Sequence, residues 1–185
     1  CEGDNSSCLT VTDIDENIYS TIQIGDQLWM KQDLKTTHYR NGDAIPTGLD
    51  NSTWASTEEG AYAIYDDDPA NAEIYGNLYN WYAVDDYRDL CMEGWHVPSD
   101  AEYTILTDYL SGEPGGKMKE CTEGSCPESE FWDSPNTGAT NESGFTGLPA
   151  GFHHNGSYVH MGSYGDFWSS SEYISGDAWR RALHY

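Results

Sequence analysis

The amino-acid sequence predicts a single α+β domain, and three patterns support this class. Apolar and polar residues alternate over residues 18–30, which indicates an N-terminal β-hairpin. Two helices are expected next, a short amphipathic one at 77–85 and a longer capped one at 100–110. The chain after residue 112 is rich in turn residues and short apolar runs, which indicates a loop-rich C-terminal β half.

The N-terminal hairpin is predicted from its alternation and its turn. Ile22 and Ile24 alternate with polar residues, as expected for a strand with one buried face. The pair Gly25-Asp26 is typical of a two-residue hairpin turn, and residues 27–30 supply the return strand.

The polar segment 1–12 is expected to be a tether or a first edge strand, and residues 13–185 to form the single domain. Within that domain, residues 39–60 are rich in turn signals and are predicted to be irregular. The short helix at 77–85 is expected because Leu78, Trp81 and Tyr82 have the i, i+3, i+4 spacing of one helix face.

The longer helix, Asp100 to Leu110, has recognisable ends. Ser99 and Glu102 form a capping box, in which each side chain bonds the backbone N–H of the other residue. Gly112 is the expected C-terminal stop. The face expected to be buried carries Tyr103, Leu106 and Leu110.

In the C-terminal half, residues 133–144 contain almost no apolar residue and are predicted to be a surface loop. Four short strands are expected, at 145–148, 157–161, 167–171 and 178–185.

The charge of the chain excludes some classes of partner. Its 185 residues include 32 acidic and 8 basic ones, for a formal net charge of -24. Nucleic acids and anionic lipids bind clustered Lys and Arg, so neither is an expected partner. No run approaches the roughly 20 apolar residues of a membrane-spanning helix, so no transmembrane segment is expected. Aromatic residues make up 14% of the chain, enough to build a folded core.

The cysteines favour an oxidising, extracellular setting. Cys121 and Cys126 are five positions apart in a turn-like segment, and a disulfide between them is predicted. A Cys1–Cys8 bridge is a weaker expectation. Cys1 is either the lipidated first residue of a bacterial lipoprotein, hence a lipid anchor, or simply where the sequence begins.

Several long strings resemble the Fibrobacter succinogenes major paralogous domain. The most specific are GWHVPSDAE (94–102), SPNTGATNESGF (134–145) and FWSSSEY (167–173). The resemblance runs in order through almost the whole chain. It implies a bacterial protein, secreted or on the outer cell surface, with a C-type-lectin-like fold of the branch that contains formylglycine-generating sulfatase modifiers.

Two departures from the family pattern stand out. Glu16 stands where the family usually has Gly, and the pattern usually continues for about two strands and a late Cys beyond Tyr185. The resemblance therefore implies that 178–185 is an edge strand and that Cys91 lacks its mate. Three outcomes are open: a longer protein, a gap filled by Leu9–Val11 with a Cys8–Cys91 bridge, or a strand donated by a neighbouring subunit.

No enzyme signature is present, and the chain is not expected to be an enzyme. It lacks a zinc helix, a nucleophile elbow, a phosphate-binding loop and a dinucleotide motif. The formylglycine-generating relatives act through a cysteine pair, and none of Cys91, Cys121 and Cys126 lies in a matching motif.

The best candidate for a metal site is a calcium site in an acidic run. Calcium prefers oxygen ligands, and adjacent like charges repel unless they are neutralised or solvated. The alternative is a solvated acidic loop. The three histidines at 153, 154 and 160 are expected to be exposed loop residues rather than ligands. The calcium candidates are Asp66, Asp67, Asp68 and Asn71.

The best ligand-binding candidates are aromatic and basic residues on the C-terminal strands. In lectin-like folds of this branch these strands display the binding face, and flat rings suit sugars or partner side chains. The alternative is that Trp168 and Trp179 belong to the core and that the arginines form ion pairs. The candidates are Tyr158, Tyr164, Trp168, Tyr173, Trp179, Arg180 and Arg181.

Two functions are compatible with these features. The first is a non-catalytic binding module on the cell surface or outside the cell that presents a lectin-like face to a glycan or protein. The second is a structural subunit of an extracellular fibre, sheath or surface layer, in which the same face binds copies of itself.

Overall fold

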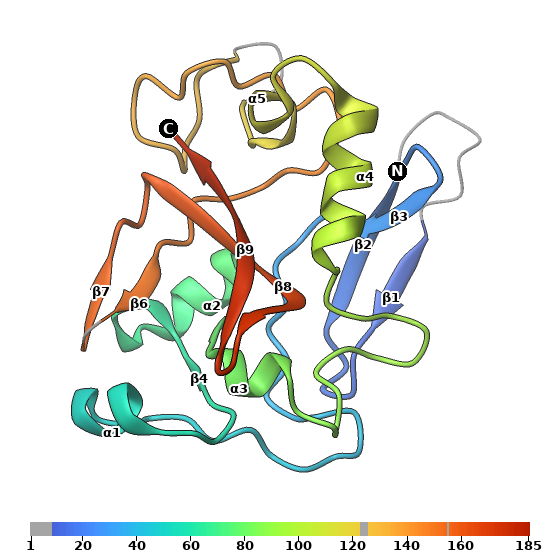
Figure 1. Cartoon of the computed structure of the whole chain (residues 1–185). Helices are drawn as coiled ribbons and strands as arrows, with labels where there is room; N and C mark the ends of the chain where they lie inside the picture. Colours follow the sequence, from blue (N-terminus) through green and yellow to red (C-terminus); the bar gives the residue numbers. More distant parts are fainter. Residues whose placement is uncertain (1–8, 123–125, 155) are drawn as a thin grey trace.

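The computed structural model describes residues 9–122, 126–154 and 156–185, and it has the predicted α+β class (Figure 1). The strands are β1 (Thr10–Thr12), β2 (Ile18–Ile24), β3 (Gln27–Met30), β4 (Tyr62–Ala63), β5 (Leu78–Tyr79), β6 (Phe152–His154), β7 (Ser157–Val159), β8 (Tyr164–Ile174) and β9 (Asp177–His184). The helices are α1 (Asn51–Ser56), the 3-10 turn η1 (Tyr65–Asp67), α2 (Pro69–Tyr75), α3 (Trp81–Val84), α4 (Asp100–Leu110) and α5 (Pro114–Met118). None of these described helices is long and apolar enough to cross a membrane.

The predicted N-terminal hairpin is confirmed as β2 and β3. The two strands pair antiparallel, and Gly25 in their turn has a φ of 60°, which suits glycine best. β1 pairs with the other edge of β2, so the sheet order is β1-β2-β3. The segment around Leu9–Val11 therefore lies against β2 and does not fill the free edge of β9.

Helix α4 has the predicted bounds and the predicted capping box. The Ser99 side chain accepts from the Glu102 N–H, and the Ser99 N–H donates to Glu102 Oε2 at 2.8 Å. Tyr103, Leu106 and Leu110 are buried, as their shared face predicts. The helix lies beside the N-terminal hairpin on one side and the β8–β9 pair on the other (Figure 1).

The described residues form more helices than the two that were predicted. In the segment 77–85, Leu78 belongs to strand β5, and helix α3 begins later because the Asn80 side chain accepts from the Ala83 N–H. Helix α1 lies in the stretch predicted to be irregular, where Asp50 caps it by accepting from the backbone N–H groups of two following residues.

The C-terminal half contains two antiparallel pairs, β6–β7 and β8–β9. Three of the four predicted strands are present in β7, β8 and β9, whereas 145–148 contains only an isolated bridge from Gly147 to Lys119. Residues 133–144 form a loop as predicted, but Asn136 and Ala139 within it are buried.

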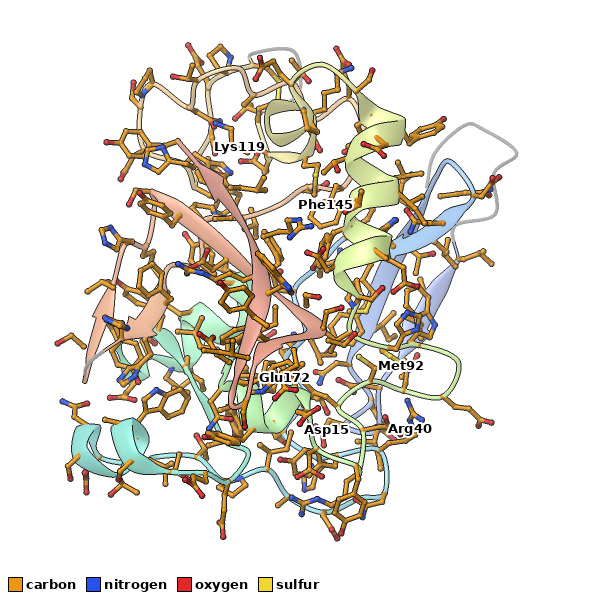
Figure 2. All side chains as sticks on the ribbon, in the orientation of Figure 1. Asp15, Arg40, Met92, Lys119, Phe145 and Glu172 are labelled. Carbon is orange, nitrogen blue, oxygen red and sulfur yellow. A yellow bond between two sulfur atoms is a disulfide. The ribbon has the colours of Figure 1, made fainter. Side chains whose placement is uncertain are left out.

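The main core lies between the N-terminal hairpin, α4 and β9. Trp29 packs against Tyr103 and Phe145, with ring centroids 5.4 and 5.8 Å apart (Figure 2 labels Phe145 beside α4). Leu106 is completely buried at its centre. The buried members are Ile24, Trp29, Tyr103, Leu106, Leu110, Met118, Trp132, Phe145 and Leu183.

One arginine fixes the irregular segment 89–95 against the rest of the domain. Arg40 donates from Nε to the Cys91 carbonyl at 2.7 Å and from Nη2 to the Trp95 carbonyl at 3.1 Å. Figure 2 shows Arg40 beside the segment that carries Met92, whose carbonyl also accepts from Nη2. This loop is therefore held by side-chain bonds in place of a strand ladder.

Asp15 holds the chain entering the hairpin against residues 36–38. Its carboxylate accepts from the Thr37 N–H at 2.5 Å, from the hydroxyls of Thr36 and Thr37, and lies 2.5 Å from His38 Nδ1. Burial raises the pKa of Asp15, but these hydrogen bonds lower it more, so its net pKa lies below the ordinary value of 3.8.

Asp15→Asn is expected to destabilise the protein by about 1.5–3 kcal/mol at neutral pH, the range for hydrogen bonds to a charged group. A depressed carboxyl pKa contributes stability that is present above the ordinary pKa and is lost as pH falls through the folded-state pKa. The difference between wild type and variant should therefore shrink below a pH of about 4. Urea unfolding at several pH values measures it, and the exposed Asp85→Asn variant is the control. A difference that stays constant down to a pH of about 3 would contradict this account.

Candidate functional site

The end of the β8–β9 hairpin exposes a pair of aromatic rings. Tyr173 on β8 and Trp179 on β9 are 57% and 45% exposed, and their ring centroids lie 4.6 Å apart at 72°. Ile174 beside them is 60% exposed. Because exposed apolar side chains that contact one another are unusual on a soluble surface, this group marks a candidate binding site.

Local backbone geometry accounts for this exposure. The β8–β9 register shifts between Trp168 and Glu172 and again before Ile174, so the strand end is bulged. Bulges bend a strand and redirect its side chains. The chain then reverses through a two-residue turn in which Gly176 has a φ of 81°.

The two adjacent arginines project from opposite faces of β9. Arg180 forms an ion pair with Asp166 and lies over the Phe152 ring at 5.9 Å. Arg181 pairs with Asp100 at 2.6 Å, at the start of α4, and lies over Tyr103. Both arginines therefore form ion pairs, as the alternative expected.

Trp168 is half-buried and does not belong to the exposed pair. Its Nε1 donates to the Tyr79 carbonyl at 2.8 Å, and its ring lies 6.0 Å from that of Trp81. These contacts connect β8 to β5 and α3. They agree only in part with the alternative that assigned this tryptophan to the core, because no core cluster of the described residues includes it.

Tyr164 lies in a separate cluster at the start of β8. Its ring centroid is 4.4 Å from that of His184 and 4.9 Å from that of His160. His154 and His160 are exposed, as expected, but His153 is partly buried against Trp54. The seven predicted ligand-binding residues are thus divided among several places, and Tyr173 and Trp179 are the two that stand together on the surface.

Tyr158 connects the strand β7 to the acidic run. Its hydroxyl donates to Asp67 Oδ1 at 2.7 Å. Asp68 caps α2 by accepting from the Ala70 N–H, and the Asn71 amide donates to the Tyr65 carbonyl at 2.9 Å. The side chains of Asp67, Asp68 and Asn71 in the acidic run therefore already form hydrogen bonds within the protein.

Within the described residues, no group of three or more His, Cys, Asp or Glu side chains is placed to hold a metal ion. The calcium site at Asp66, Asp67, Asp68 and Asn71 stays a prediction from sequence, to which the capping contacts add no support.

The predicted Cys121–Cys126 disulfide is present, with Cα atoms 5.2 Å apart. Cys91 is a buried free cysteine, and burial raises the pKa of its thiol to about 12. A thiol that stays protonated at neutral pH is a poor nucleophile. Cys1 and Cys8, and with them the possible bridge and lipid anchor, lie outside the described residues.

Sequence reasoning missed two acids near these strands. Asp166, the partner of Arg180, follows a glycine in β8, and its only signal was alternation along the strand. Asp33 occurs in the polar string KQDLK and looked like an ordinary surface acid, yet it lines a large cavity. A cavity depends on distant segments, so no local pattern could have indicated it.

Comparison with known proteins identifies the family. The model of the Fibrobacter succinogenes major domain matches residues 22–185, which include the end of β2, all of β3, α4 and both C-terminal strand pairs. No curated protein and no solved structure matches the chain. The match extends over most of the sequence, and the chain therefore belongs to the Fibrobacter succinogenes major domain family.

Proposed function

We propose that this protein is a non-catalytic binding module, secreted or held on the outer surface of a bacterium, that binds a glycan or protein through the end of its β8–β9 hairpin. The exposed pair of Tyr173 and Trp179 is the observation that carries the proposal. An aromatic face packs against the apolar face of a sugar ring or against a partner side chain, and buried aromatics often dominate binding energy.

The fold belongs to the same proposal. We infer a C-type-lectin-like arrangement, supported by the α+β architecture in which one long helix, α4, packs beside a C-terminal pair of long strands. In such an arrangement the late strands and their loops carry the ligand, which agrees with the exposed rings on β8 and β9.

Charge restricts the ligand. A net charge of -24 repels acidic ligands and favours neutral or cationic ones. Arg180 does not offset this near the rings, because Asp166 already pairs with it. We therefore expect neutral glycans to bind in preference to sulfated or sialylated ones.

A glycan array tests the proposal. Wild-type protein is expected to bind one or more neutral glycans, and a double variant Tyr173→Ala/Trp179→Ala should bind at least about tenfold more weakly. The control is Tyr87→Ala, which removes a ring that is 90% exposed at another place. Binding that the double variant retains in full, or a preference for acidic glycans, would contradict the proposal.

A second candidate function rests on the free edge of β9. Within the described residues β9 pairs with β8 alone, and its far edge offers backbone groups to another strand. The His184 carbonyl is already bonded by Lys119 Nζ at 2.8 Å, so part of this edge is blocked. Polymers in size-exclusion chromatography of the array sample would favour a fibre or layer subunit, and monomers would favour the binding module.

A further inference from the structure

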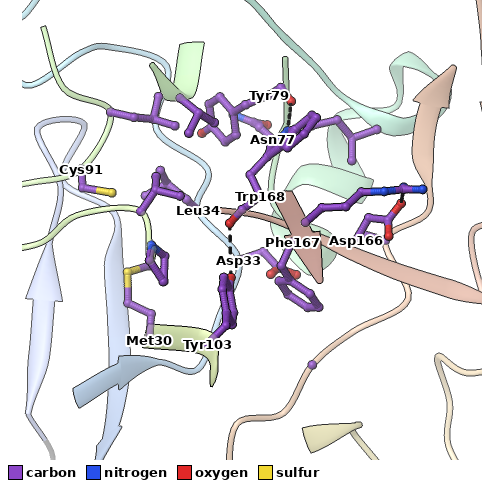
Figure 3. Close-up of a pocket in the computed structure, with 18 of the residues that line it drawn as sticks. Met30, Asp33, Leu34, Asn77, Tyr79, Cys91, Tyr103, Asp166, Phe167 and Trp168 are labelled. Carbon is purple, nitrogen blue, oxygen red and sulfur yellow. Dashed lines mark hydrogen bonds and ion pairs between the residues drawn. The ribbon is translucent and has the colours of Figure 1, made fainter. Parts of the chain in front are cut away.

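A cavity of about 1430 Å³, partly open to solvent, extends from the N-terminal hairpin past β5 to the end of the β8–β9 hairpin. Its lining is largely apolar and aromatic, and includes Leu34, Tyr103, Phe167 and Trp168 (Figure 3). Ligand pockets are typically about 300–1,000 Å³, so this volume is sufficient for a small organic molecule.

A carboxyl group lies within this apolar lining. Asp33 follows β3 directly, and Figure 3 shows it among Tyr103, Phe167 and Trp168. Its carboxyl forms no hydrogen bond or ion pair with any described residue, and burial alone raises its pKa to about 7. Asp33 keeps some accessible surface, and it is one of the residues that line the cavity.

An unpaired acid in such a place lowers stability unless something satisfies it. Burying an unpaired carboxyl is unfavourable, and proteins normally give such a group a partner. Neighbouring groups do not supply one: the Tyr103 hydroxyl is directed to the Trp168 carbonyl at 3.4 Å, and Arg180 is paired with Asp166. Folding thus holds Asp33 beside a cavity without an internal donor.

We propose that this cavity binds a small organic ammonium ion, with the ammonium group on Asp33 and the apolar body against Tyr103, Phe167 and Trp168. A carboxylate and aromatic ring faces together form a typical site for such cations. The net charge of -24 attracts cations to the molecule as a whole. Tyr173 and Trp179, proposed above to bind glycans, line another part of the same cavity, so the two proposals rest on different residues of it.

Binding of simple amines to the whole chain tests the inference. The probes are a set of aryl-alkyl and cycloalkyl ammonium ions, among them phenethylammonium, with 2-phenylethanol as its neutral counterpart. Isothermal titration calorimetry is expected to show binding of at least one ammonium probe, with its neutral counterpart at least about tenfold weaker, equivalent to 1.4 kcal/mol.

The decisive variant is Asp33→Asn, which keeps the shape and removes the charge. We expect at least about a tenfold loss of ammonium affinity, equivalent to 1.4 kcal/mol. The control Asp108→Asn changes an exposed acid on α4 that does not line the cavity, and it should leave the affinity unchanged. Since Asp33→Asn removes an unfavourable buried acid, the variant should fold at least as well as wild type, which a thermal melt verifies.

Two results would overturn the inference. One is equal ammonium affinity in Asp33→Asn and wild type. The other is failure of every ammonium probe to bind wild type at millimolar concentration. Neither depends on glycan binding, so the two proposals can fail separately.

Discussion

Leu106→Ala is expected to destabilise the domain by about 3–4 kcal/mol, within the range measured for leucine truncation in closed cores. Leu106 has no exposed surface and lies in the main core with Trp29 and Tyr103. The surrounding elements, α4, the N-terminal hairpin and β9, all contact this core, so they cannot close the resulting cavity without separating from another partner.

Urea unfolding measures this effect, and the neighbouring residue provides a matched control. Ile105 is on the same helix but is 55% exposed, so Ile105→Ala should change stability by less than about 1 kcal/mol. Equal losses for the two variants would mean that α4 does not bury the face that the structure assigns to it.

Lys119→Met is expected to destabilise the domain by about 2–4 kcal/mol, because two part-buried hydrogen bonds from a charged donor are lost. Lys119 is only 2% exposed, and its Nζ donates to the carbonyls of Thr137 and His184 at 2.9 and 2.8 Å. The ammonium also lies 5.4 Å from the centre of the Trp132 ring. This single side chain joins the loop 133–144 to the end of β9 (Figure 2).

The free-energy cost of burying the Lys119 charge opposes the stabilisation that its hydrogen bonds provide. Burial correspondingly lowers the pKa of the ammonium group. Thermal and urea unfolding of Lys119→Met decide which effect is larger. Lys31→Met serves as the control, because the Lys31 side chain forms no hydrogen bond or ion pair with the described residues. A variant as stable as wild type would show that the penalty for burying the charge cancels the two hydrogen bonds.

Helix α4 and the N-terminal hairpin were predictable because their signals are local. The Ser99 and Glu102 capping box and the Gly25 turn determine where these elements begin and end. Strand β5 was not predicted, because no local signal indicates it. Leu78 and Tyr79 are extended because they pair with β4, which lies earlier in the sequence. A helical spacing in the sequence was overridden there by a long-range contact.

Helix α2 is a different kind of miss, because its signal was present. Asp68 followed by Pro69 is a good N-cap and first-turn pair, but the density of charge in the run favoured a metal interpretation instead. For the candidate site, sequence identified the exposed Tyr173 and Trp179. The sequence alone could not distinguish this pair from the less exposed Trp168. Which side chains of β8 are buried depends on a bulge, and no local sequence pattern predicts that bulge.

Hydrogen–deuterium exchange of the wild-type chain, with and without the glycan that binds best on the array, tests the central claim most directly. It reports which backbone segments a ligand protects. We predict slower exchange confined to residues 170–181, around Tyr173 and Trp179 at the end of the β8–β9 hairpin. Protection confined to other segments, such as residues 30–34 at the Asp33 end of the cavity, would contradict the assignment of the binding face.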